Sequence, residues 1–485
     1  MTDQDSGNKL NRRQFLKASG VAGAVAGSTG LGLFGYAAGV DPRSYQGYQS
    51  FEGADQNFDR EKWSVDEPTY QKIGPGIRPD ARTENIFDRR GRFMGSYKPG
   101  CKIEDMDELL QEHYKKNPND FELDILDIEE ISPKQRQDSR EYRDQFILAN
   151  AYSRAMGAVS PRQDNRPPEV ADFPSAGRRG EAAQEPMNLK SPKMTSKLIK
   201  KMAHEFGSTL VGIAKLNPDW VYLHTHRGRG FDVDTPIEVP EHWEYAIAVG
   251  TPMSWDPMYA NPNYGTSEDA YSRTRIITYR LASFIKQLGY AARPHVPGNS
   301  YDLMVPPILV DAGLGEQGRH SIVITPELGC NFRAGIVTTN IPMQTDKPID
   351  IGVQDFCESC YICADNCPSS SITKEGRIDI RGYRRWEIDK ASCLNFWNST
   401  LGSMGCRLCI AACPYTRKAN WLHKTAFKVS LNDPTGLADK VLTSLQKSFY
   451  ETPDPQKYYI PSLGGENASY REPPWWLRSE DFFDF

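Results

Sequence analysis

Eight cysteines in two closely spaced sets dominate the chemistry that this sequence could perform. The first set has the spacing C-x2-C-x2-C-x3-C-P and consists of Cys357, Cys360, Cys363 and Cys367. The second set places Cys393 ahead of Cys406, Cys409 and Cys413, and Pro414 follows directly. Such spacing is typical of two [4Fe–4S] clusters, because the short spacers wrap three corners of one cubane while the fourth sulfur reaches the other cluster.

This exchange of the fourth ligand predicts two ligand sets. The first cluster takes Cys357, Cys360, Cys363 and Cys413, and the second takes Cys367, Cys393, Cys406 and Cys409. The alternative is a pair of zinc sites built from the same C-x2-C corners. Zinc ribbons need neither a third cysteine at this spacing nor a Cys-Pro closure. The pattern therefore favours one-electron transfer through a module over residues 351–422 that resembles the bacterial ferredoxins.

The start of the chain resembles a twin-arginine export signal over residues 1–39. Arg12 and Arg13 precede Phe15, and a Gly/Ala-rich stretch follows over residues 18–40. That stretch is long enough to be a membrane anchor, the alternative, but its Gly, Ser and Ala content is high for one. Because this export route carries folded, cofactor-loaded proteins, it agrees with the cysteine motifs.

Composition narrows the function further. The formal net charge of −5 provides no basic footprint for nucleic acid. No segment after the signal is a convincing membrane span. Of the ten cysteines, only Cys101 and Cys330 lie outside the two sets, and we expect both to be buried free thiols rather than a disulfide.

The remaining chain divides into three predicted units. Residues 40–187 are polar and Pro/Gly-rich, which predicts a loop-rich N-terminal unit. Residues 188–350 alternate between helical and strand patterns, which predicts a mixed α/β domain with a sheet covered by helices. Residues 423–485 form a C-terminal extension.

Within residues 188–350, helical spacing continues to a stop at Gly207, and a second helix starts with a capping-box pattern at Thr266 and ends at Gly289. Cys330 and Arg333 fall in an expected turn between two strands. The expected strands are residues 209–214, 245–251, 321–325 and 335–339.

Gly313, Gly315 and Gly318 match the G-x-G-x-x-G pattern of dinucleotide-binding folds. That fingerprint requires a helix to begin there, so that its N-terminus faces a pyrophosphate. The residues that follow favour a strand instead. We therefore give nicotinamide binding little weight.

The export signal, the α/β domain and the two cysteine sets together resemble the respiratory reductive dehalogenases. The segment from Asp311 to Arg319, followed by Ile324 to Gly329 and by Arg333, is similar to the central signature of this family. The resemblance implies a corrinoid-binding, nitroreductase-like sheet-and-helix domain. It also implies a base-off cobamide, to which two [4Fe–4S] clusters deliver electrons, and a small organohalide substrate.

The resemblance also implies the site residues. Tyr271 is the expected proton donor and Arg333 its basic neighbour, while Asn299 and Trp397 line the substrate pocket. A phenol has a reference pKa of about 10, and a nearby guanidinium or a helix N-terminus favours its anion. Taken from local sequence alone, Tyr271 would be a surface tyrosine and Arg333 an ion-paired turn residue.

The resemblance implies partners and a location as well. We expect an upstream electron donor and a small integral-membrane anchor subunit, which would hold the exported enzyme at the outer face of the cytoplasmic membrane. The sequence has no D-x-H-x-x-G motif for a histidine ligand to cobalt, as expected for the family. Two alternatives remain: an epoxyqueuosine reductase, which acts on tRNA, and an exported iron–sulfur electron-transfer protein without a corrinoid.

Overall fold

The structure is a computed structural model that describes residues 58–97, 100–129, 155, 185–226, 234–254, 258, 264–295, 302–399, 405–416, 421–433 and 436–449. The export signal, Asn299 and residues 450–485 lie outside the described residues. Within the described ranges, no helix is long and apolar enough to cross a membrane.

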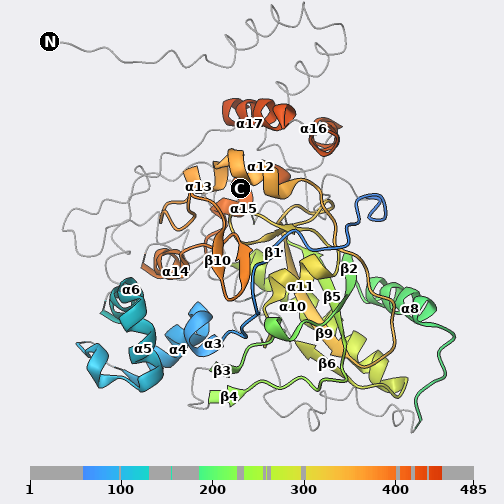
Figure 1. The fold of residues 1–485 in the computed structure, drawn as a ribbon, viewed down its shortest axis with the longest axis horizontal. Helices are drawn as coiled ribbons and strands as arrows, with labels where there is room; N and C mark the ends of the chain where they lie inside the picture. Colours follow the sequence, from blue (N-terminus) through green and yellow to red (C-terminus); the bar gives the residue numbers. More distant parts are fainter. Residues whose placement is uncertain are drawn as a thin grey trace, which may run out of the picture.

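A four-stranded antiparallel sheet forms the centre of the molecule, with strand order β2-β5-β9-β6 (Figure 1). These strands are β2 (Leu210–Lys215), β5 (Tyr245–Pro252), β9 (Phe332–Thr339) and β6 (Ala292–His295). The long central pair, β5 and β9, is almost entirely buried. The predicted strands over residues 209–214, 245–251 and 335–339 are thus confirmed, the first two within one residue and the third with a start three residues earlier.

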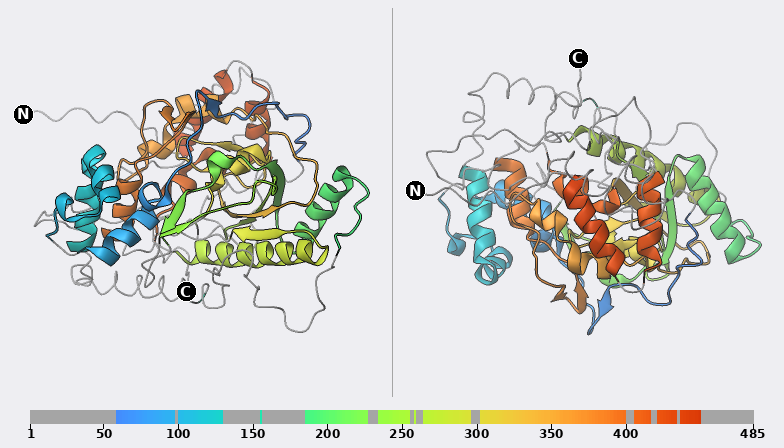
Figure 2. Two further views of the ribbon diagram at one scale, coloured as in Figure 1. Left: turned by 60° about the horizontal axis from the view of Figure 1, so that its bottom comes forward. Right: turned by 90° about the horizontal axis from the view of Figure 1, so that it is seen from above.

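The two faces of the sheet pack against different helices. Ile247 and Val249 join a core cluster with residues of α8 (Pro192–Glu205) and α10 (Gly265–Gln287). Their neighbours Ala246 and Ala248 point to the opposite face, which packs against α11 (Val305–Asp311). Successive side chains of a strand alternate between faces, so an uninterrupted apolar run is what a sheet covered on both faces requires. Figure 2 shows α10 running along the lower face of this sheet.

Local sequence explains where these helices begin and end. The side chain of Ser191 caps α8 by accepting from the backbone N–H of Met194, and Gly207 ends it with φ of +105°. Gly289 ends α10 in the same way, with φ of +85°. The predicted capping box at Thr266 was wrong. The helix starts one residue earlier, and Thr266 lies inside its first turn, where its hydroxyl donates to the Ser254 carbonyl.

Two strand predictions need correction. The expected strand over residues 321–325 shrinks to β8 (Val323–Ile324), which pairs with β7 (Glu316–Gln317) in a separate hairpin. In addition, β9 already begins at Phe332, so Arg333 lies in a strand of the central sheet and only Cys330 lies in the turn. Because the glycine-rich segment leads into the β7–β8 hairpin, it lacks the strand–turn–helix geometry of a dinucleotide site.

The described N-terminal residues are more regular than their composition predicts. Residues 81–129 form α3 (Ala81–Glu84), α4 (Ile86–Ser96), η1 (Ile103–Asp105), α5 (Glu108–Lys116) and α6 (Pro118–Glu129). The expectation of a loop-rich unit is wrong for this part. Phe93, Leu110 and Tyr114 form a small buried core, and Arg89 pairs with Asp124 at 2.9 Å inside it. Internally paired charges made the segment look polar.

The cysteine-bearing segments lie above the central sheet (Figure 1). They contain α12 (Val353–Cys360), α13 (Ile362–Asp365), α14 (Lys390–Ser399), α15 (Leu408–Ala412) and η4 (Pro414–Thr416). A hairpin of β10 (Ile378–Ile380) and β11 (Tyr383–Arg385) pairs with β1 (Gln71–Lys72). Helices α16 (Trp421–Leu431) and α17 (Leu437–Phe449) follow, and α17 contacts α12. A second hairpin, β3 (His224–His226) with β4 (Asp234–Pro236), follows η3 (Pro218–Trp220).

Candidate functional site

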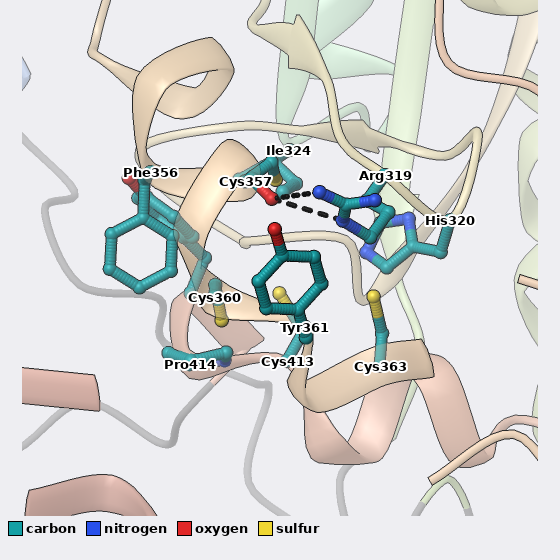
Figure 3. A pocket seen from close by; sticks show the side chains of 11 residues that line it. Arg319, His320, Ile324, Phe356, Cys357, Cys360, Tyr361, Cys363, Cys413 and Pro414 are labelled. Carbon is teal, nitrogen blue, oxygen red and sulfur yellow. Dashed lines mark hydrogen bonds between the residues drawn. The ribbon is translucent and has the colours of Figure 1, made fainter. Parts of the chain in front are cut away.

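Four of the predicted cluster cysteines line one cavity. Cys357 and Cys360 lie on α12, Cys363 lies on α13, and Cys413 follows the end of α15 (Figure 3). Tyr361 makes this possible, because its backbone adopts the left-handed region with φ of 51° and turns the chain between the two helices. The cavity brings together the four residues predicted for the first cluster.

Arg319 ties this cavity to the α/β domain. Its guanidinium is buried between the rings of Tyr361 and Trp386, at 4.5 and 4.3 Å from their centroids. It donates to the carbonyl of Cys357 through Nε at 3.0 Å and Nη2 at 2.7 Å (Figure 3). Further bonds reach the carbonyls of Thr373 and Glu375. Two of its hydrogen bonds therefore hold the first cysteine loop, and two hold the segment that follows the loop.

The other four cysteines also gather together. Cys406 and Cys367 lie close enough to Cys393 for their charges to raise its pKa, and Cys367 raises the pKa of Cys406 in the same way, in addition to the larger effect of burial. Cys409 adjoins the same three thiols. This set brings α14 and α15 together, and it corresponds to the residues predicted for the second cluster.

The surroundings of these thiols suit metal binding. Burial raises the pKa of Cys360 and of Cys406 to about 12. A buried thiolate is costly unless a positive charge compensates it, and bound iron supplies that charge. Cys413 differs from the others, because a hydrogen bond from Cys330 holds its pKa well below the usual range, with further help from His320.

No disulfide joins Cys101 to Cys330, and the prediction that both thiols are buried is confirmed for Cys330 but wrong for Cys101. Cys101 packs against the core of the N-terminal helices and is partly exposed. Cys330 is fully buried and lies beside Cys413. No local sequence pattern would have revealed that Cys330 lies beside Cys413.

Tyr271 and Arg333 meet at the N-terminal half of α10. The guanidinium carbon of Arg333 lies over the Tyr271 ring, 5.2 Å from its centroid. Arg275, one turn further along the helix, approaches the same ring at 5.9 Å. Arg333 reaches this position from β9, where its backbone pairs with Thr251, and its Nη2 donates to Ser267 at 2.9 Å. The predicted pair is therefore assembled from two elements of the α/β domain.

Trp397 packs in an aromatic group that includes Tyr264, whose phenol lies near Tyr271 and Arg333. Its ring lies 6.3 Å from that of Tyr264, the residue that precedes α10, and 6.0 Å from that of Phe87 on α4. This aromatic group thus combines side chains from the N-terminal helices, the α/β domain and the cysteine-bearing segments. Asn299, the other predicted pocket residue, lies outside the described residues.

Two residues missed by the sequence reasoning complete the surroundings. Arg407 directly follows Cys406 and is buried, with Nη1 at 3.5 Å from the Ser267 hydroxyl. The hydroxyl of Ser267 therefore accepts hydrogen bonds from the guanidinium groups of both Arg333 and Arg407. The position of Arg407 between two predicted ligands was a usable signal in the sequence. A charge inside a buried cysteine loop needs a partner, so it points to a polar group nearby.

Three buried polar atoms around the start of α10 have no hydrogen-bond partner among the described residues. They are Nε of Arg333, Oδ1 of Asn331 and Nε1 of Trp397. Asn331 belongs to this group because its amide donates to the carbonyl of Met253, whose sulfur lies 3.7 Å from the Ser267 hydroxyl. Buried polar groups are rarely left unsatisfied, so this grouping indicates a place for a polar ligand.

The signature segment itself is mainly structural. Asp311 accepts from the Tyr70 hydroxyl at 2.6 Å and from Trp220 Nε1 at 2.9 Å, and burial raises its pKa to about 6. Glu316 accepts from the backbone N–H groups of Ile351 and Val353, and burial raises its pKa to about 7. These two carboxyl groups join the sheet domain to the N-terminal residues and to the cysteine-bearing segments.

Comparison with known proteins agrees with this arrangement. Residues 356–416 match the family described as the 4Fe-4S dicluster domain, and residues 9–29 match the twin-arginine translocation pathway signal sequence. Over 272 residues the chain is 35% identical to the tetrachloroethene reductive dehalogenase of Sulfurospirillum multivorans. The aligned residues cover 49% of this chain and 53% of that protein. The chain is therefore similar to the reductive dehalogenases over about half of its length.

The fold agrees with this similarity as well. A solved catabolic reductive dehalogenase superposes with a TM-score of 0.58 at 19% identity, over 82% of this chain and 50% of that one. The predicted fold class, the iron–sulfur domain and the twin-arginine export signal are thereby confirmed. The chain spans about half the length of the curated relative that it matches.

The epoxyqueuosine reductases match this chain less well than the reductive dehalogenases do. The enzyme of Aliivibrio fischeri is 31% identical over 152 residues, which cover 30% of this chain and 39% of that protein. The export signal also argues against an enzyme that acts on tRNA in the cytoplasm.

Proposed function

We propose that this chain is a reductive dehalogenase, which removes halogen, chloride in the first instance, from a small organohalide during anaerobic respiration. The observation that carries the proposal is the position of the Tyr271–Arg333 pair. It lies against Ser267, which Arg407 of the second cysteine set also approaches. The proposed proton-donor pair and the proposed electron-transfer module thus each bring a guanidinium group to the same residue, Ser267.

The two cysteine sets would hold two [4Fe–4S] clusters. The cavity shared by Cys357, Cys360, Cys363 and Cys413 supports the first ligand set. The charges of Cys367 and Cys406 raise the pKa of Cys393, and these three thiols together raise the pKa of Cys409, which supports the second ligand set. Both sets contain only buried or half-buried thiols, the donor type that iron–sulfur clusters require.

A corrinoid would occupy the space around the start of α10. The side-chain amides at the edge of a corrin ring are donors and acceptors, which could satisfy the unpaired atoms of Arg333, Asn331 and Trp397. When bound, its cobalt would supply the low-potential electrons that break a carbon–halogen bond.

The chain's own residues would position the substrate and supply a proton. Tyr271 would give its phenolic proton to the carbon that loses halide, if the product gains hydrogen. Arg333 would hold the ring of Tyr271 in place and attract the departing halide. Trp397 would form one wall, and Asn299 is proposed as a further pocket residue. A vicinal dihalide could lose both halogens without any proton.

The export signal and the homology support a location outside the cytoplasm. We infer a peripheral enzyme at the outer face of the cytoplasmic membrane, held by a small integral-membrane subunit and reduced by an upstream donor. The proposed units are a signal over residues 1–39, an N-terminal unit over 40–187, the corrinoid and substrate domain over 188–350, the cluster domain over 351–422, and an extension over 423–485.

Cofactor extraction tests the proposal against its rival. The full chain is produced anaerobically with cobamide and iron, purified, and extracted with acid or solvent. We expect near-stoichiometric corrinoid together with the iron. Full iron loading without corrinoid would contradict the proposal and would favour an exported electron-transfer protein.

A further inference from the structure

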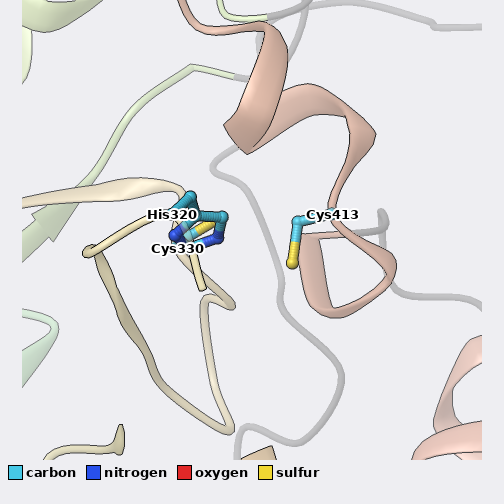
Figure 4. A group of neighbouring side chains, drawn as sticks. All are labelled: His320, Cys330 and Cys413. Carbon is cyan, nitrogen blue, oxygen red and sulfur yellow. The ribbon is translucent and has the colours of Figure 1, made fainter. Parts of the chain in front are cut away.

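A histidine and a cysteine from outside the two cysteine motifs lie beside Cys413. His320, Cys330 and Cys413 are all buried, and one ligand atom from each lies within 4.8 Å of the others (Figure 4). His320 precedes the β7–β8 hairpin's return strand, and Cys330 lies in the turn before β9. The α/β domain therefore brings two polar side chains to one sulfur of the cysteine-lined cavity.

The hydrogen bonds of His320 identify its free donor. The backbone N–H of Ile322 donates to His320 Nδ1 at 3.2 Å, so Nδ1 is an acceptor and a neutral ring carries its proton on Nε2. Nε2 is buried and has no partner among the described residues. Because His320 lines the same cavity as the four cysteines, an unused N–H group faces the space where the first cluster would lie (Figure 3).

Thr416 leaves the thiol proton of Cys330 available in a similar way. Its hydroxyl oxygen accepts from the backbone N–H of Cys330 at 3.1 Å and lies 2.8 Å from the Cys330 sulfur. The hydroxyl can therefore donate its own proton to that sulfur. The Cys330 thiol is then free to donate to Cys413, whose sulfur lies within 4.8 Å of its own.

We infer that His320 and Cys330 act as hydrogen-bond donors that raise the reduction potential of the first cluster, through Cys413 and the neighbouring cluster sulfur. The inference rests on the proposed assignment of Cys413 to that cluster. Reduction adds negative charge to the sulfur atoms, so hydrogen bonds to them become stronger and stabilise the reduced state. Such contacts from outside the ligand set are a known way of tuning a metal centre.

The same three residues could be mistaken for an independent metal site. A tetrahedral metal would need Cys413 as its own ligand, and the C-x2-C-x3-C-P type of motif already commits that thiol to a cluster. The donor role leaves the ligand set unchanged. It also accounts for the unused Nε2 of His320.

Matched variants separate hydrogen bonding from packing. In His320→Asn the short amide keeps an acceptor for Ile322 but no longer reaches the cavity, whereas the longer side chain of His320→Gln retains a donor near the position of Nε2. Cys330→Ala removes the donor, and Cys330→Ser keeps one. The variants are made in the full chain and reconstituted anaerobically.

A redox titration followed by electron paramagnetic resonance measures the effect. The signal lost in a Cys357→Ala variant identifies the first cluster, and the other signal is an internal reference. We expect His320→Asn and Cys330→Ala each to shift the first midpoint potential to more negative values and to leave the second unchanged. His320→Gln and Cys330→Ser should lie closer to the wild type.

Two results would overturn the inference. One is an unchanged first midpoint in both His320→Asn and Cys330→Ala, with both signals at full intensity. The other is loss of one whole cluster in Cys330→Ala, which would make Cys330 a ligand. Neither result contradicts the proposed function. A wild-type protein that bound zinc in place of iron would contradict the proposed function and this inference together.

Discussion

The guanidinium of Arg333 lies over the ring of Tyr271, 5.2 Å from its centroid, and also donates to Ser267 at 2.9 Å. The contact crosses from β9 to α10, two elements of the α/β domain that pack against each other. Stacking fixes the plane of the phenol, so its hydroxyl has a defined direction in the pocket.

Replacing Tyr271 with phenylalanine tests its role as proton donor. Loss of a positioned general acid typically lowers the rate about 10²- to 10⁴-fold, so we expect hydrogenolysis to fall by at least about 10²-fold. Iron and corrinoid content should stay at wild-type levels. Tyr290→Phe is the control, because that hydroxyl only donates to the Met187 carbonyl. Full hydrogenolysis activity in Tyr271→Phe would remove this residue from the mechanism.

Substitutions at Arg333 test whether its shape matters as well as its charge. Lysine keeps the charge but loses the planar group that contacts both Tyr271 and Ser267. We expect kcat to fall in the order wild type, Arg333→Lys, Arg333→Gln. Steady-state kinetics with one organohalide gives kcat and KM separately. Equal kcat in the lysine variant and the wild type would show that charge alone is sufficient.

Cys357→Ser tests the proposed ligand sets. Loss of one ligand from a buried set should remove or degrade the first cluster only, so the iron content should fall from about eight to about four atoms per chain. Cys101→Ser, which changes a cysteine of the N-terminal helices outside both cysteine sets, should retain all the iron. The measurement is iron and acid-labile sulfide per chain. Loss of all iron from Cys357→Ser would argue against two separately assembled clusters.

We expect the substitution Asp311→Asn to change how the free energy of unfolding depends on pH. Burial raises the folded-state pKa of Asp311 from 3.8 to about 6, so the neutral acid is the form that the fold prefers. Its contribution is fully present below pH 3.8 and declines as the pH rises through 6, and asparagine has no such loss. Between pH 5 and pH 7.5 the variant should gain about 1–1.5 kcal/mol relative to the wild type.

Thermal unfolding of the reconstituted proteins across this pH range checks that prediction. Asparagine can accept from Trp220 and donate to Tyr70, so the contacts of Asp311 have a replacement. The exposed change Glu122→Gln should leave the pH dependence as it is in the wild type. A constant difference in melting temperature between Asp311→Asn and wild type would contradict the assignment of a raised pKa.

Sequence reasoning located features whose physics is local. The cysteine spacing found all eight thiols, and Gly207 and Gly289 ended the two main helices because both adopt positive φ. Features that depend on distant partners were missed. The apolar residues Val323 and Ile324 form a strand, but no local pattern shows that it pairs with β7 rather than with the central sheet.

The site divides in the same way. Tyr271 and Arg333 were predicted through a family resemblance, and the structure brings them into contact. Ser267 and Arg407 escaped notice, because their meeting depends on packing between segments about 140 residues apart. The N-terminal helices were hidden for a related reason, since Arg89 and Asp124 neutralise each other only after folding.

The most direct test of the central claim is halide release by the reconstituted full chain. Chlorinated alkanes, alkenes and aromatics are incubated anaerobically with the protein and an artificial low-potential donor, and chloride and products are quantified. We predict chloride release, matched by a dehalogenated product, from protein that contains corrinoid. The contradicting result is no halide release from any substrate by protein whose iron and corrinoid are both complete.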